Sequence, residues 1–185
     1  MKKVIYLFIF CIIISSCTSK PHYVVKGKIT GSDSIIFYLQ KREGGKIVSI
    51  DSAISRKGAF TMKNGSVEYP QMIQLVAGKT RKRTSFYIDN SEITVTGNLD
   101  SLYKAKVTGS RTQDEYSALI ESNKPLSDIY SKSIIKYQAA SMAGDKANIS
   151  ILEKQADSIQ NEMINLQKNF VKNNPSSYVS PSILV

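Results

Sequence analysis

Few side chains in this sequence have the type and spacing that covalent or catalytic chemistry needs. The 185 residues contain two cysteines, Cys11 and Cys17, and one histidine, His22. A serine–histidine–aspartate arrangement would depend on His22, and no nucleophile-elbow motif accompanies it. One histidine and so few cysteines are also a poor ligand set for a metal ion. These patterns predict no catalytic centre, no metal site and no cofactor, and they leave the Cys17 thiol as the main candidate for chemistry.

Cys17 ends a segment with the order of a secretory signal. Two lysines precede an apolar run of eleven residues, Val4 to Ile14, and the small pair Ser15-Ser16 stands before the cysteine. A positive start, an apolar stretch and small residues at its end are typical of a signal peptide. The run is too short to span a bilayer, which takes roughly 20 residues. We therefore expect cleavage before Cys17, with residues 1–16 as the signal; an ordinary signal peptide is the alternative to a lipoprotein signal.

The end of this segment resembles the lipobox of bacterial lipoproteins. The resemblance implies that Cys17 is acylated and becomes the first residue of the mature chain. Thr18, in place of an aspartate, resembles the outer-membrane sorting pattern of Gram-negative lipoproteins. Stable anchoring takes more than one acyl chain. We therefore expect a lipid-anchored protein of the cell envelope, on the outer membrane with its domain facing the periplasm or the cell surface, and residues 17–22 as the lipidated tether.

The charge of the chain is positive and uneven. The formal net charge is +10. Residues 18–110 hold 15 Lys and Arg against 7 Asp and Glu, whereas residues 111–185 hold 8 against 8. Anionic lipid and acidic glycan are the candidate ligands for such a basic region, and an exported protein rarely meets nucleic acid. The densest basic cluster, between two predicted strands and so at a hairpin tip, is Lys79, Arg81, Lys82 and Arg83. The other interpretation of this cluster is a solvated loop that keeps the protein soluble.

Residues 23–110 have the pattern of a β domain. About eight short segments rich in β-branched and aromatic residues alternate with turn residues, which predicts an antiparallel β-sandwich or a partly open barrel. Asn64-Gly65 predicts a tight turn, because both residues tolerate positive φ. Asp51-Ser52 is either a hydrogen-bonding pair or a functional carboxylate and hydroxyl. The predicted strands span residues 23–29, 34–40, 46–54, 59–63, 72–77, 84–88, 92–96 and 104–108.

Residues 111–174 have helical periodicity and predict a hairpin or stalk. Thr112 and Glu115 have the spacing of a capping box, and Pro125 predicts a kink or a restart of the first helix. The second helix has an apolar seam with steps of three and four residues. We expect this seam to pack on the first helix; a homodimer through residues 149–170 is the alternative. The seam is Ile149, Leu152, Ala156, Ile159, Met163, Leu166 and Phe170, and the expected apolar residues of the first helix are Tyr116, Leu119, Ile120, Ile129, Ile134 and Tyr137.

Short motifs in the β region resemble one family in their order along the chain. They are Val25-Lys26-Gly27-Lys28-Ile29, Ile36-Phe37-Tyr38-Leu39, Ile50-Asp51-Ser52-Ala53, Lys57-Gly58-Ala59-Phe60, Tyr69-Pro70, Phe86-Tyr87-Ile88 and Val107-Thr108-Gly109-Ser110. The order resembles the domain of unknown function 4369 over about residues 23–120. The resemblance implies the N-terminal domain of a lipid-anchored thioredoxin-like (AhpC/TSA type) protein. Asn174-Pro175-Ser176-Ser177 is similar to an element of the helical linker that leads to the redox domain in that family.

The sequence departs from this family in its redox chemistry. A thioredoxin-type site needs a Cys-x-x-Cys pair with an activated thiol, and this sequence has none. We therefore expect residues 175–185 to be a truncated linker, and the chain to be a short form or a truncated product without enzymatic activity. The leading hypothesis is a non-catalytic envelope module that positions or recruits a redox domain or another protein. The alternative is a binding module for an anionic glycan or lipid through the basic cluster.

Overall fold

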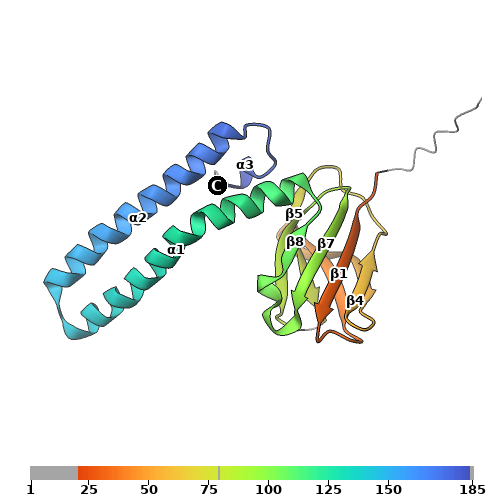
Figure 1. The fold of residues 1–185 in the computed structure, drawn as a ribbon, viewed down its shortest axis with the longest axis horizontal. Coiled ribbons are helices and arrows are strands. Elements are labelled where there is room, and N and C mark those ends of the chain that lie inside the picture. Colours follow the sequence, from red (N-terminus) through yellow and green to blue (C-terminus); the bar gives the residue numbers. More distant parts are fainter. Residues whose placement is uncertain (1–20, 79, 184–185) are drawn as a thin grey trace, which may run out of the picture.

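A β-sandwich followed by a long helical hairpin makes up the protein (Figure 1). The computed structural model describes residues 21–78 and 80–183. The predicted signal peptide, Cys17, Lys79 and the last two residues lie outside the described residues. Across the described ranges, no helix is both long and apolar enough to cross a membrane. The strands are β1 (Val24–Thr30), β2 (Ile36–Glu43), β3 (Lys46–Ile54), β4 (Ala59–Met62), β5 (Gln71–Ala77), β6 (Arg83–Ile88), β7 (Glu92–Asn98) and β8 (Lys106–Thr108).

The two sheets confirm the predicted sandwich and exclude the barrel alternative. Their strand orders are β4-β1-β7-β8 and β3-β2-β5-β6. Neighbouring strands are antiparallel except β1 and β7, which pair in parallel with Val25 opposite Ile93. Alternate side chains of both sheets point inward, where Phe37 and Phe60 stack with ring centroids 4.5 Å apart. Gly27 makes room for this stack, because a Cβ at that position would lie 2.0 Å from the Phe60 ring.

Two local predictions in the β region are wrong. Leu99–Lys104 forms a 3-10 helix, η1, so the last strand begins only at Lys106. Asn64-Gly65 has no positive φ at either residue, and β4 and β5, on either side of it, belong to different sheets. The backbone crosses between the sheets here, and Asn64 donates two hydrogen bonds to Asp51, from its backbone N at 3.1 Å and its Nδ2 at 3.3 Å.

Asp51 organises the edge where the two sheets meet. Its Oδ1 also accepts a hydrogen bond from the Ser52 backbone N at 2.7 Å. Its Oδ2 accepts one from the Tyr23 hydroxyl at 3.4 Å. These bonds, together with those from Asn64, favour the hydrogen-bonding interpretation of Asp51 over a functional carboxylate.

Replacing Tyr23 with Phe is expected to reduce the loss of stability at alkaline pH. Burial, and then the Asp51 carboxylate, raises the pKa of Tyr23 from 10.0 to about 12. An unfolded tyrosine loses its proton near pH 10, so the stability that this group contributes is present below pH 10 and is lost as the pH rises toward 12. Urea unfolding across this range measures the effect. The decline should be shallower in Tyr23→Phe than in the wild type and unchanged in Tyr69→Phe, which alters an exposed ring; equal slopes in both variants would contradict the assignment.

The two long helices, α1 (Arg111–Ala143) and α2 (Lys146–Asn173), form the predicted hairpin. Ser110, and not Thr112, caps α1: its hydroxyl accepts a hydrogen bond from the Gln113 backbone N at 3.1 Å. The predicted restart at Pro125 is wrong, because α1 runs through it as one helix. Gly144, with a φ of 69°, ends α1 in the left-handed conformation that glycine adopts at low cost.

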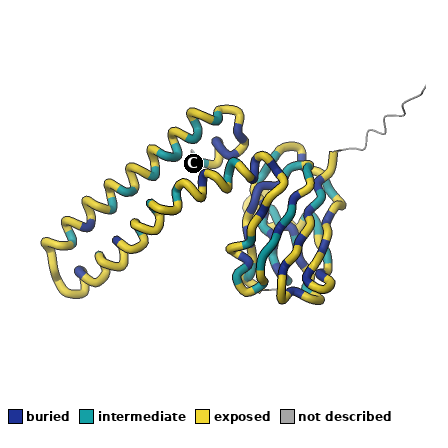
Figure 2. Tube along the Cα trace, in the orientation of Figure 1, coloured by how far each residue is buried: buried dark blue, intermediate teal, exposed yellow. Residues whose placement is uncertain are grey.

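The predicted seam of α2 packs on α1, as Figure 2 shows by the less exposed residues along the facing sides of the helices. On α1, Ile120, Ile129 and Ile134 are 49%, 50% and 36% exposed, so their predicted place in the apolar face is wrong. The facing residues of α1 follow a seven-residue pattern that includes polar side chains, which hydrophobic periodicity does not detect. They are Tyr116, Leu119, Asn123, Leu126, Tyr130, Ser133, Tyr137 and Ala140. A homodimer through the α2 seam stays a prediction, and it would need this intramolecular packing to open or the helices to be exchanged between chains.

Candidate functional site

The sandwich and the hairpin are joined around Tyr87 of β6. Its backbone N donates a hydrogen bond to Gln113 Oε1 at 2.8 Å, and its hydroxyl shares one with Ser182 Oγ at 2.7 Å. Its ring meets Tyr116 edge to face, with centroids 5.4 Å apart, and packs in a small apolar cluster with Leu119. Because β6 is an edge strand, α1 both covers its side chain and satisfies one of its free backbone groups.

The end of the described chain folds back on this joint. The Ser177 hydroxyl donates a hydrogen bond to Glu115 Oε2 at 2.5 Å. That bond, followed by the Arg111 guanidinium, lowers the pKa of Glu115. Val179 is 0% exposed within the Tyr87 cluster, and a short helix, α3 (Ser180–Ile183), follows it. The described part of the predicted linker, residues 175–185, is thus folded against the domain.

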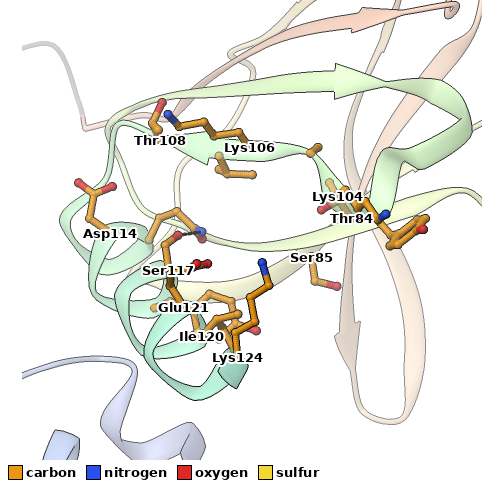
Figure 3. A pocket seen from close by; sticks show the side chains of 15 residues that line it. Thr84, Ser85, Lys104, Lys106, Thr108, Asp114, Ser117, Ile120, Glu121 and Lys124 are labelled. Carbon is orange, nitrogen blue, oxygen red and sulfur yellow. Dashed lines mark hydrogen bonds between the residues drawn. The ribbon is translucent and has the colours of Figure 1, made fainter. Parts of the chain in front are cut away.

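A groove of about 700 Å³ lies between α1 and the neighbouring edges of the two sheets (Figure 3). Hydroxyl groups from β6, β8 and α1 line it, among them those of Ser85, Thr108 and Ser117. Its charged lining combines three lysines with two acids. These are Lys104, Lys106 and Lys124, and Asp114 and Glu121. Figure 3 shows Lys124 extending from α1 toward the strands on the opposite wall.

The described residues of the basic cluster lie beside this groove. Arg81 and Lys82 lie in the turn between β5 and β6, as predicted, and Arg83 is the first residue of β6. Together with η1, these three residues line a smaller hollow of about 380 Å³. Lys82 Nζ is 2.6 Å from Asp100 Oδ1. This ion pair lowers the pKa of Asp100 and partly neutralises the cluster, whereas Arg81 and Arg83 are exposed.

Four further residues belong to this surface that the sequence analysis did not identify. Tyr103 is 70% exposed and lines both hollows. The ammonium group of Lys104 lies 5.4 Å from the centre of the Tyr103 ring. Lys106 follows in β8. The close spacing of Tyr103, Lys104 and Lys106 was the only feature of the sequence that could have indicated a binding surface. No feature of the sequence could have assigned Lys124 to this surface, since tertiary folding alone brings α1 beside β6.

The surface is suited to binding an anion. Arginine and lysine donate hydrogen bonds to carboxylate and phosphate groups, and the hydroxyl groups of the groove add neutral donors. No group of three or more His, Cys, Asp or Glu side chains in the described parts of the chain is arranged to hold a metal ion. His22 lies two residues before the start of β1 and is not among the residues that line the groove or the smaller hollow.

A comparison with protein families identifies the β domain. The model of the family described as "Domain of unknown function (DUF4369)" matches residues 23–116, more than half of the chain. The chain belongs to this family. The match confirms the resemblance seen in the strand motifs; it spans every strand of the DUF4369 domain and the start of α1, including Gln113 of the joint. No curated protein and no solved structure matches the chain.

Proposed function

We propose that this DUF4369 protein is a non-catalytic module of the cell envelope, anchored by lipid on Cys17, that positions a partner beside its β domain. The observation that carries the proposal is the joint around Tyr87. The Tyr87 backbone N donates a hydrogen bond to Gln113, and the Tyr87 hydroxyl shares one with Ser182. These bonds hold the hairpin to the edge of the sandwich, and Val179 is buried in the same cluster. A connection fixed on two sides sets the direction of the hairpin.

Because the hairpin is long and its direction is fixed, it can hold a partner at a defined position. At 1.5 Å per residue, the 33 residues of α1 extend for about 50 Å. A partner bound to the hairpin is therefore held at a set distance and direction from the β domain. In line with the family resemblance, the partner is a redox domain supplied by another chain or another envelope protein.

Two spin labels test the fixed direction. One is attached at Lys63→Cys on the sandwich and one at Met142→Cys near the hairpin tip, in the full chain with Cys11 and Cys17 replaced by Ser. Both positions are exposed. We expect one narrow distance distribution. A further Val179→Asp change buries a charge without a partner, which costs several kcal/mol, and should broaden the distribution.

The matched control is Tyr178→Asp, which places the same charge on a neighbouring residue that is 53% exposed. It should leave the distribution narrow. A broad distribution in the parent protein would contradict the positioning function. Disulfide reductase or peroxidase activity of the purified mature form would contradict its non-catalytic part.

A second function, binding of an anionic envelope ligand, is supported by the basic cluster. Arg81 and Arg83 are exposed beside a hollow, and neither has a salt bridge among the described residues. Free guanidinium groups next to a hollow can form paired hydrogen bonds with a carboxylate or phosphate. Lys79, which lies outside the described residues, belongs to the same turn in the sequence.

A further inference from the structure

We propose that Tyr103 is the centre of a binding site for an acidic polysaccharide, which runs from the basic cluster into the groove beside α1. The proposal deepens the second function and rests on it. The ligand is an acidic polysaccharide, and residues on η1, β8 and α1 make most of the contacts with it, more than residues 81–83 do.

The two hollows are neighbours on the surface. The groove of about 700 Å³ and the smaller hollow of about 380 Å³ share Tyr103 as a lining residue. The ring of Tyr103 is therefore a surface that a ligand crossing from one hollow to the other must contact. Both hollows are open rather than enclosed, and a ligand that occupies both at once must be an extended chain.

The side chains that line the two hollows around Tyr103 are mainly basic. Arg81 and Arg83 lie on one side, and Lys104, Lys106 and Lys124 lie on the other. Asp100 is occupied by Lys82, and the remaining acids of the two linings are Asp114 and Glu121. The free cations thus outnumber the free acids along the path by five to two. A repeating anionic chain can meet several of them, while the hydroxyl groups of the groove are suited to sugar hydroxyls.

The site lies at the end of the sandwich opposite to the start of β1. The Val24 backbone N bonds to Ser91 O at 3.0 Å, so β1 starts beside the turn that follows β6. Arg81, Lys82 and Arg83 lie at the start of β6 and therefore at the opposite end of the sandwich, about 17 Å away along a six-residue strand; Figure 1 shows β1 starting at the end away from η1. With Cys17 in the membrane, the site can face away from it. This placement favours a glycan over the lipid headgroups of the anchoring membrane.

Fluorescence anisotropy with a labelled oligogalacturonate of about ten sugars tests the proposal on the full chain in detergent micelles. We expect saturable binding that weakens with salt, since exposed charges are screened. Tyr103→Ala should weaken binding about tenfold, as loss of an aromatic anchor does, and Lys104→Gln with Lys124→Gln should do the same. The control is Lys63→Gln with Lys154→Gln, which removes the same charge from exposed positions elsewhere and should change binding less than about twofold.

Other results would contradict the proposed site, the second function or both. If Arg81→Gln with Arg83→Gln abolishes binding but Tyr103→Ala leaves it unchanged, this proposal fails and the second function stands. If oligogalacturonate does not bind, this proposal fails, whereas the second function fails only if dihexanoyl phosphatidylglycerol does not bind either. If oligogalacturonate binds and no variant affects its binding, both fail. Equal competition by neutral maltodextrin of the same length would exclude recognition of acid groups. Stronger competition by dihexanoyl phosphatidylglycerol would identify a lipid headgroup in place of the glycan. Circular dichroism verifies that each variant is folded.

Discussion

Replacing Cys17 with Ser is expected to move the protein from the membrane fraction to the soluble fraction of a Gram-negative host. Each acyl chain contributes about 0.8 kcal/mol for every CH₂ buried in the bilayer. Serine lacks the thiol to which the lipid is attached, so all of this binding energy is lost. We expect at least a tenfold fall in the membrane-bound fraction, measured by immunoblot after ultracentrifugation and a high-salt wash.

Cys11→Ser is the matched control, because it removes a sulfur from within the predicted signal peptide. It should leave membrane retention unchanged. The high-salt wash removes protein that is held only by charge, which matters for a chain with a net charge of +10. Continued retention of Cys17→Ser after the wash would show that something other than lipid on Cys17 holds the protein at the membrane.

Gly109→Ala is expected to be the most destabilising single methyl addition at the connection between the sandwich and the hairpin. Gly109 links β8 to the Ser110 cap of α1 with a φ of 106°. A Cβ there would lie 2.1 Å from the Glu92 carbonyl oxygen, so the backbone must move. We expect a loss of about 3 kcal/mol or more in the free energy of unfolding. For a chain of this size, that lowers Tm by about 6–12 °C.

Gly144→Ala is the control that separates the effect of the steric clash at Gly109 from the effect of its positive φ. Gly144 also has a positive φ, but nothing lies within 4 Å of its added Cβ. The cost is then only that of a left-handed alanine, about 1–2 kcal/mol. Thermal unfolding followed by circular dichroism should rank Gly109→Ala well below Gly144→Ala, and equal Tm values would contradict the close packing at the β8–α1 connection.

The sequence predicted most of the fold because its local signals agree with the tertiary structure. Alternating strands with turn residues predicted the sandwich, and the three- and four-residue steps of α2 predicted the hairpin. Local patterns could not predict the parallel pairing of β1 and β7, since alternation is the same for both directions. The sequence predicted Thr112 as the cap of α1, whereas the structure has Ser110. Both residues have a hydroxyl that can cap a helix, so the residue type could not decide between them. The side of α1 that faces α2 was missed because it includes polar residues such as Asn123 and Ser133.

The candidate site was only partly predictable. The position of the basic cluster between two predicted strands correctly placed its described residues, Arg81, Lys82 and Arg83, at the β5–β6 hairpin. Tyr103 was assigned no role because the sequence does not show that η1 leaves its ring 70% exposed. Lys124 could not be connected with Lys104 because β8 and the start of α1 separate them in the chain. Tertiary packing, and not local pattern, forms the groove.

The joint around Tyr87 links the family match with the proposed function. The matched residues end at Tyr116, whose ring contacts Tyr87. The DUF4369 domain therefore contributes part of the surface that fixes the hairpin, and residues beyond the match, such as Val179, complete it. A domain that ends in a docking surface for its own following helices is suited to holding them in one direction.

The mass of the N-terminal peptide of the membrane-extracted protein tests the lipid-anchored module most directly. The account predicts a peptide that begins at Cys17 and carries the added mass of two or three acyl chains. A peptide that begins at another residue, or one that begins at Cys17 without added mass, would contradict it.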